Sequence, residues 1–204
     1  MAKVQKEKQQ AILAERNRDE LQFLYVLLTD NGRKLPTIKK EVLVQAFASA
    51  AGQGYVNVLE KLLHLGADKL GRTKCRGETA LHIAAAQGQA EVVGLLLKKD
   101  VPVDVKDEND RMPLHCAVSH GQLDTVQLLL QNKAPINAKT SEGLTPLHLA
   151  VVAGRLPVVD VLMRFGADVS ISGGVPTGQT PLELAQSLGR GEIINRLRRS
   201  RDKR

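Results

Sequence analysis

Aromatic side chains are almost absent from this chain of 204 residues, which has no Trp, two Tyr and three Phe. A core without large rings has to be filled by Leu, Val and Ala, and these pack densely only where backbones come close together, as between short helices. Apolar residues make up 43% and charged residues 25% of the sequence, a balance typical of a folded protein rather than a disordered one. The composition therefore favours one domain of short, closely packed helices.

Cysteine and long apolar runs are also scarce. The chain has two cysteines, Cys75 and Cys116, too few for a disulfide framework, and no apolar stretch behind a basic start resembles a signal peptide. The longest apolar run near the start, residues 23–28, has six residues, whereas a membrane-spanning helix needs about 20. We therefore expect a protein of the cytoplasm or nucleus, with no membrane span.

The sequence also lacks the motifs of common enzyme and metal sites. No Cys/His spacing matches a zinc site, and the glycines of "ISGGVPTGQT" (171–180) do not fit a phosphate-binding loop. No nucleophile, base and orienting group stand out as a set. We predict no catalytic residue, no metal ligand and no cofactor, and hence a protein that is not an enzyme.

The net charge of +7 is spread unevenly. Residues 1–44 carry +3, residues 45–189 carry −1 and residues 190–204 carry +5, so that the excess lies at the two ends. The final segment "RLRRSRDKR" (196–204) fits a nuclear localisation signal, a solubilising end or a contact with an anionic surface. Nucleic acid is disfavoured as a partner, because no aromatic side chain lies near a basic cluster to stack on bases.

A repeat occupies most of the chain. Four segments share one frame, and each precedes an apolar run: "GETALHIAAAQG" (77–88), "DRMPLHCAVSHG" (110–121), "GLTPLHLAVVAG" (143–154) and "GQTPLELAQSLG" (178–189). Their equivalent positions Thr79, Met112, Thr145 and Thr180 are 33, 33 and 35 residues apart, and "QAFASAAGQG" (45–54) is a weaker fifth copy upstream. Periods of this length are typical of solenoids, in which stacked units bury a core that no unit buries alone.

Each copy contains the signals that begin and end a helix. Thr145 and Thr180 are good N-caps, and the proline after each suits the first helical position, where no N–H is needed. A glycine closes each of the four clear copies, as expected where a left-handed residue ends a helix. A second helix is predicted from apolar residues at i, i+3 and i+4, such as Val92, Leu95 and Leu96.

The period, the T-P-L-H opening and the "GAD" after the second helix resemble the ankyrin repeat. The resemblance covers residues 45–197, in five units that start near residues 45, 77, 110, 143 and 178. It implies an all-α repeat solenoid in which each unit has two antiparallel helices and a projecting β-hairpin. Residues 1–44 are then an N-terminal helical extension, in which residues 18–29 are predicted to cap the solenoid, and residues 198–204 are a basic tail.

Three of the five histidines occupy one repeat position. A catalytic histidine occurs once per site, whereas these recur every 33 residues. The resemblance implies that each imidazole forms a hydrogen bond between loops of adjacent units, beside the threonine hydroxyl. The residues expected to hold the repeat together are Thr79, His82, His115, Thr145, His148 and Thr180. Cys116 is predicted to be an inert buried thiol and Cys75 an exposed one in a hairpin loop.

The resemblance implies that a partner protein binds the concave face, formed by hairpin tips and exposed positions of the first helices. We therefore predict a non-enzymatic protein–protein interaction module, monomeric on its own, that serves as an adaptor, scaffold, regulatory inhibitor or chaperone. The candidate partner-binding residues are Arg72, Lys74, Arg76, Lys106, Asp107, Asp110, Arg111, Ser119, His120, Glu142, Leu144, Val152, Ala153 and Arg155. The alternative is an adaptor that contacts nucleic acid or anionic membrane through its basic ends, with the repeats as scaffold.

Asn137, in "LLLQNKAPINAKT" (128–140), is a candidate modification site. It stands where ankyrin-repeat proteins of animals are often hydroxylated on asparagine. The resemblance therefore implies hydroxylation of Asn137, on the condition that the source is an animal.

Overall fold

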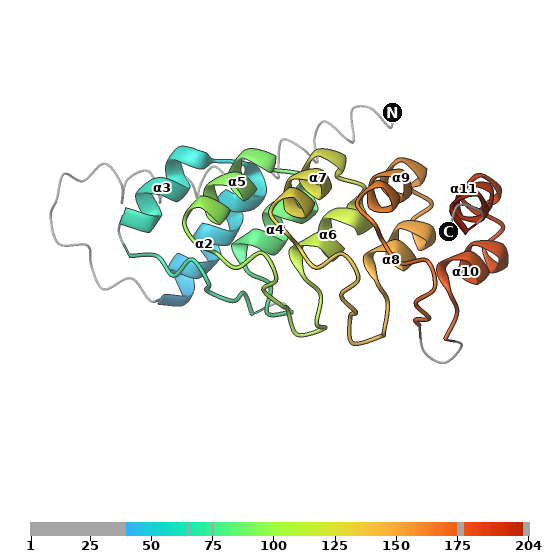
Figure 1. The fold of residues 1–204 in the computed structure, drawn as a ribbon. Coiled ribbons are helices and arrows are strands. Elements are labelled where there is room, and N and C mark those ends of the chain that lie inside the picture. Colours follow the sequence, from blue (N-terminus) through green and yellow to red (C-terminus); the bar gives the residue numbers. More distant parts are fainter. Residues whose placement is uncertain (1–39, 65, 75, 175–177, 202–204) are drawn as a thin grey trace, which may run out of the picture.

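The computed structural model describes residues 40–64, 66–74, 76–174 and 178–201, which form a row of short helices (Figure 1). The segment 1–39, Cys75 and the end 202–204 lie outside the described residues. Capping by residues 18–29 and the exposure of Cys75 therefore stay predictions.

The helices come in pairs, each with one member in an inner row and one in an outer row. The inner row consists of α2 (Lys40–Gln53), α4 (Ala80–Gln87), α6 (Pro113–His120), α8 (Pro146–Val152) and α10 (Pro181–Ser187). The outer row consists of α3 (Val56–His64), α5 (Ala90–Lys98), α7 (Leu123–Gln131), α9 (Leu156–Arg164) and α11 (Gly191–Arg201). Each helix packs against its partner and against the same row of the next unit, which confirms the all-α repeat solenoid.

Both ends of the row extend beyond the predicted repeat boundaries. The helix α2 begins at Lys40, upstream of the predicted start at residue 45, and α11 continues to Arg201, past the predicted end at residue 197. Part of the predicted extension and most of the predicted basic tail are therefore helices of the first and last units.

The core runs through all units and consists of aliphatic side chains. Leu81, Leu114 and Leu147, which are equivalent in three successive inner helices, are all buried. Phe47 of α2, 2% exposed, is the one aromatic residue in the buried core of the described residues. Each buried leucine stabilises the stack by about 1.5–3 kcal/mol relative to an exposed one. Small side chains let neighbouring helices approach closely, as the scarcity of aromatic residues predicts.

The turns between units project to one side of the row, the lower side in Figure 1. One backbone hydrogen bond closes each turn: Thr73 N–H to Glu78 O (2.9 Å), Asp107 to Arg111 (2.9 Å), Thr140 to Leu144 (3.0 Å) and Gly173 to Gln179 (2.9 Å). Only the last pair counts as a β-bridge, so that within the described residues the expected β-hairpins are tight turns without strands. Adjacent turns are joined by bonds from Glu108 N–H to Arg76 O (3.1 Å) and from Ser141 N–H to Asn109 O (2.9 Å).

Each of the three repeated histidines connects its own unit to the next, as the resemblance implies. The Nε2 atoms of His82, His115 and His148 lie 2.9, 3.0 and 2.9 Å from the carbonyl oxygens of Arg111, Ala138 and Gln179. At the other side of each ring, Nδ1 accepts a hydrogen bond from the backbone N–H of the helix N-cap three residues earlier. Because an amide N–H can only donate, Nδ1 is the acceptor and Nε2 carries the proton that bonds to the next unit.

Burial keeps these imidazoles neutral. It lowers the pKa of His82, His115 and His148 below the ordinary value of 6.5, mainly because a charged ring is poorly solvated in the core. Protonation would also place a hydrogen on Nδ1 opposite an N–H group that already points at it. The hydrogen bonds between units therefore depend on neutral histidine.

We predict that acid destabilises the stack through these three rings. Above pH 6.5 the rings are neutral in both states, and their contribution to stability is fully present. Below pH 6.5 the unfolded chain takes up protons that the folded chain does not, so the free energy of unfolding falls by up to about 4 kcal/mol per pH unit for three rings. Denaturant unfolding between pH 7.5 and 5 measures this slope. A flat profile over that range would contradict the prediction. In the variant His148→Gln, the number of protons taken up on unfolding should be lower by about one per molecule.

Two outer helices end in strained residues. Gly66 and Gly166 follow α3 and α9 with φ of 82° and 87°, whereas Asp100 and Lys133 hold the equivalent left-handed positions with φ of 59° and 64°. A side chain on Cβ disfavours this conformation, which glycine adopts readily.

We predict that Lys133→Gly stabilises the protein by about 0.5–1 kcal/mol, because relief of the left-handed strain exceeds the added entropy of the unfolded chain. The matched control is Gly166→Ala, which has open space around its Cβ position and should destabilise through φ alone. Thermal unfolding of both variants checks the pair. A lower Tm for Lys133→Gly would show that the strain is not present.

Candidate functional site

The exposed ends of the inner helices form one candidate surface, which we call the inner-helix face. Two positions per unit contribute to it: Ala86 and Gln87, Ser119 and His120, Val152 and Ala153, Ser187 and Leu188. In α4, α6 and α8 the other positions are buried or half-buried, so these C-terminal positions are left facing outward, whereas α10 also exposes Glu183 and Gln186. Val152 is 47% and Leu188 45% exposed, and the other exposed large hydrophobic side chains of the described residues are Tyr55, Leu70 and Phe165.

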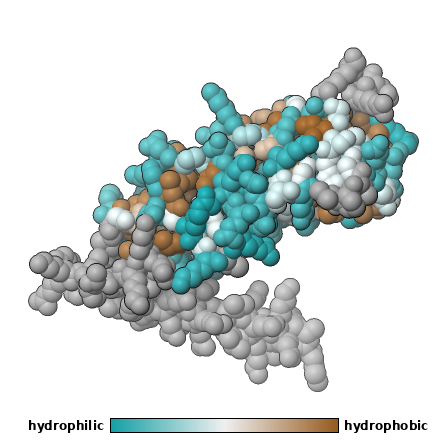
Figure 2. Space-filling view, turned by 90° about the horizontal axis from the view of Figure 1, so that it is seen from below, coloured by the Kyte–Doolittle hydropathy of each residue, from teal (hydrophilic) through white to brown (hydrophobic). Residues whose placement is uncertain are grey.

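The projecting turns form a second surface beside it. Figure 2, viewed from below, shows hydrophilic residues over most of the described surface, with separate hydrophobic areas between them. Lys74, Arg76 and Glu142 are exposed at the turns, and Leu144 is half-buried. The turns thus present charge around a small amount of apolar surface.

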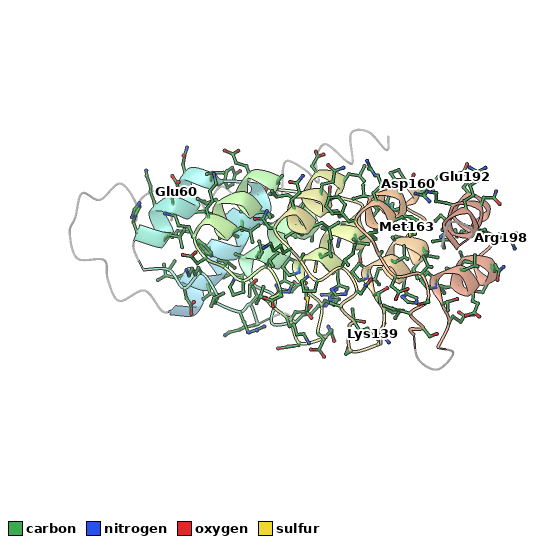
Figure 3. The ribbon with its side chains drawn as sticks, viewed as in Figure 1. Glu60, Lys139, Asp160, Met163, Glu192 and Arg198 are labelled. Atoms are coloured by element: carbon green, nitrogen blue, oxygen red, sulfur yellow. The ribbon has the colours of Figure 1, made fainter. Side chains whose placement is uncertain are left out.

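Several predicted partner-binding cations are also used within the stack. Arg72 donates from Nη1 to the carbonyls of Gly77 (2.9 Å) and Lys106 (2.5 Å), so that it joins the first turn to the second. Lys106 pairs with Asp110 at 3.0 Å, and both side chains are about half exposed. Lys139, a turn cation outside the predicted set and on the turn side in Figure 3, likewise donates from Nζ to Ser172 O at 3.0 Å. Each of these cationic side chains donates hydrogen bonds to neighbouring atoms of the same chain.

Asp107 does not belong to the surface, contrary to the prediction. Its side chain is fully covered, and its carboxylate accepts bonds from Asn109 N–H (2.8 Å), Arg111 N–H (2.9 Å) and Arg111 Nε (2.8 Å). Burial acts to raise the pKa of Asp107, but these bonds outweigh it and hold the pKa below its ordinary value. Arg111 is also partly enclosed, because it bonds to both Asp107 and Glu78 (3.0 Å). We therefore remove Asp107 from the candidate set.

We predict that Asp107→Ala destabilises the protein by about 1–3 kcal/mol, because it leaves buried N–H groups and part of the Arg111 guanidinium without an acceptor. The control is Glu108→Ala, one residue further on, where the side chain is exposed. Urea unfolding of both variants gives the difference. Equal stability of the two variants would mean that Asp107 is free to bind a partner.

A set of residues that the sequence analysis missed links the units at the inner-helix face. After α4, α6 and α10, the first residue beyond the glycine that ends the helix reaches back to the preceding unit. Gln89 donates to Gly52 O (3.1 Å), Gln122 to Ala86 O (3.2 Å) and Arg190 to Val152 O (3.2 Å). Such donors satisfy carbonyls at helix C-termini, which have no partner within the helix. The signal was the polar residue that follows the glycine in every clear copy.

Arg155 occupies the same position in its unit. It was predicted as a partner-binding residue, and its side chain is exposed, with Nε 3.1 Å from the place that a Cβ of Gly121 would take. The guanidinium therefore lies over the end of α6, beside the inner-helix face.

Within the described residues the free thiol is that of Cys116. Cys116 is buried, and burial raises its pKa to about 12, so that it remains a protonated and weakly nucleophilic thiol, as predicted. Among the described residues, no group of three His, Cys, Asp or Glu side chains is placed to hold a metal ion. None of the described helices is long and apolar enough to cross a membrane.

Asn137 is exposed in the turn after α7. Its Oδ1 accepts a hydrogen bond from Asp168 N–H at 3.0 Å, which joins its turn to the next one. Its hydroxylation stays a prediction.

Comparison with family models agrees with this architecture. A model described as ankyrin repeats (3 copies) matches residues 46–140, and one described as ankyrin repeats (many copies) matches residues 119–163. Together they cover residues 46–163, which is more than half of the chain. The comparison with curated proteins gives no match.

Proposed function

This chain belongs to the ankyrin-repeat family, and from that premise we propose that it binds a partner protein on the inner-helix face and the adjoining turns. Ankyrin repeats are generally protein–protein interaction modules. The finer role as adaptor, scaffold or regulatory inhibitor, and a location in cytoplasm or nucleus, belong to the proposal.

The observation that carries the proposal is the exposure of Val152 and Leu188 on neighbouring inner helices. Large aliphatic side chains that lie near each other on a surface are typical of binding sites, where their burial contributes affinity. The charged turns beside them suit a polar rim, which acts on specificity and association rate. A row of this length offers room for an interface of about 1,600 Å² in total.

The histidines support binding rather than catalysis. His82, His115 and His148 spend both ring nitrogens on the fold, so that none is free to transfer a proton to a substrate. The sequence analysis found no other set of catalytic groups, which is why we propose a module without enzymatic activity.

The alternative, a contact with nucleic acid or anionic membrane through the basic C-terminal end, is supported by fewer available side chains. Leu197 is 1% exposed, and Arg196 bonds to Asp160 of α9, so the start of "RLRRSRDKR" belongs to the last unit. Arg198, labelled in Figure 3, and Arg199 are exposed on the same helix. These two side chains are therefore the target for testing this alternative.

We predict that the triple variant Ser119→Arg, His120→Arg, Val152→Arg loses its partner proteins, because three long cations cover the inner-helix face. All three side chains are exposed, so we expect Tm to change by less than about 3 °C. Quantitative mass spectrometry of proteins that co-purify with the chain from its native cells measures the loss.

The matched comparison is Arg198→Gln with Arg199→Gln, which should retain those partners. Loss of the same partners with the α11 variant, and retention with the triple variant, would favour the basic-end alternative. Full retention with both variants would contradict the assignment of the face.

A further inference from the structure

The character of the inner-helix face changes between the third and fourth units. In α4 and α6 its exposed positions carry Gln87, Ser119 and His120, which are all polar, whereas α8 carries Val152 and α10 carries Ser187 and Leu188. The residues that reach back across each junction change at the same point, from Gln89 and Gln122 to Arg155 and Arg190. The last two units therefore combine apolar and cationic side chains where the earlier units are neutral and polar.

These two kinds of side chain lie next to each other, in what we call the α8–α10 patch (Val152, Ala153, Arg155, Leu188 and Arg190). Arg190 Nη2 bonds to Val152 O at 3.2 Å, which places its guanidinium beside the exposed valine. Its Nη1 also lies 3.1 Å from the Cβ position of Gly154, and Arg155 stands in the same way over Gly121. The backbone thus holds Arg190 beside Val152, whereas Arg155 lies at the neighbouring junction, over the end of α6.

Neither arginine forms an ion pair with a carboxylate among the described residues. Arg111 and Arg196 differ, because each is paired with at least one carboxylate. Glu192 follows Arg190 by two residues, but Figure 3 shows it on the outer row, with Asp160 and Met163. The charge of Arg155 and Arg190 is therefore available to a ligand.

From this arrangement we infer that the α8–α10 patch binds an extended protein segment that carries two acidic side chains about three residues apart, with an aliphatic side chain beside them. This inference rests on the proposed function and names the chemistry of its partner. Inner helices of adjacent units are roughly 10 Å apart, and an extended chain advances ~3.3 Å per residue, so that carboxylates three positions apart reach successive arginines. Val152 and Leu188 then receive the aliphatic side chain.

A ligand that carries only negative charge does not match the α8–α10 patch. A purely anionic polymer would leave Val152 and Leu188 exposed to water, and it would bind Arg198 and Arg199 of α11 equally well. An acidic and aliphatic segment uses both properties of the patch, and guanidinium groups suit carboxylates because they form paired hydrogen bonds.

The test is a selection of random 12-residue peptides displayed on phage, with the immobilised full-length chain as bait. Selected peptides are then titrated by fluorescence anisotropy against the wild type and against Arg155→Gln with Arg190→Gln. Glutamine is the residue that the chain already uses at Gln89 and Gln122, so this double variant should keep the bonds between units. Arg198→Gln with Arg199→Gln is the control, because it removes the same charge elsewhere.

We expect the selected peptides to share two acidic residues three apart next to Leu, Ile or Val. Their binding should weaken about tenfold in the Arg155/Arg190 variant at 0.05 M salt, less at 0.5 M salt, and under twofold in the control. Replacing the aliphatic residue of the peptide by serine should weaken binding as well.

Other outcomes separate this inference from the proposed function. Peptides without an acidic pair, or peptides that bind the Arg155/Arg190 variant and the wild type equally, would overturn the inference. If such peptides still lose binding in the triple variant of the inner-helix face, the proposed function stands with a different ligand. Equal losses of peptide affinity in both arginine variants would indicate attraction to net charge alone and would overturn the inference. Failure to select any peptide would contradict both this inference and the proposed function.

Discussion

The stack depends on one recurring interaction, the hydrogen bond from a buried neutral imidazole to the turn of the next unit. At His82, His115 and His148 a single ring accepts from its own helix N-cap and donates to the following unit, so that local and long-range structure are connected through one side chain. The helices themselves have only seven to fourteen residues, too short to be stable in isolation. They persist because each unit orders the next and completes its apolar core.

The last unit shows how such a chain of contacts ends. Glu183 holds the histidine position, and its Oε2 accepts from both Thr180 N–H (2.8 Å) and Thr180 Oγ1 (2.9 Å), so the carboxylate replaces the acceptor role of Nδ1. A carboxylate has no N–H to offer a following turn, and α10 is where the row stops in the described residues. The exchange of histidine for glutamate therefore keeps the helix start and removes the N–H that the other three units direct at the next turn.

The repeated part of the fold could be predicted well, because most inner helices carry local signals. A proline begins α6, α8 and α10, and a glycine with positive φ follows every inner helix, whereas α2 and α4 lack the proline. Asp107 could not be placed in this way. An aspartate in a run of charged residues reads as solvated, and only the folded turn shows three donors closing around it. The hydrogen bonds of Gln89, Gln122 and Arg190 to the preceding unit could not be predicted for a similar reason. Their acceptors are backbone carbonyls 36 to 38 residues away, and a backbone carbonyl is not marked by any residue type in the sequence.

The division between repeated and variable positions also explains where function can reside. A residue that bonds to the next unit is constrained in every copy, because its loss would weaken a junction on which both neighbours depend. The ends of the inner helices carry no such constraint, and they vary from Gln87 through His120 to Val152 and Leu188. The arginine bridges combine both roles: Arg190 satisfies a carbonyl with one N–H and retains four others. An arginine at this position can therefore bond to the preceding unit through one N–H and offer its other N–H groups to a partner without destabilising the fold.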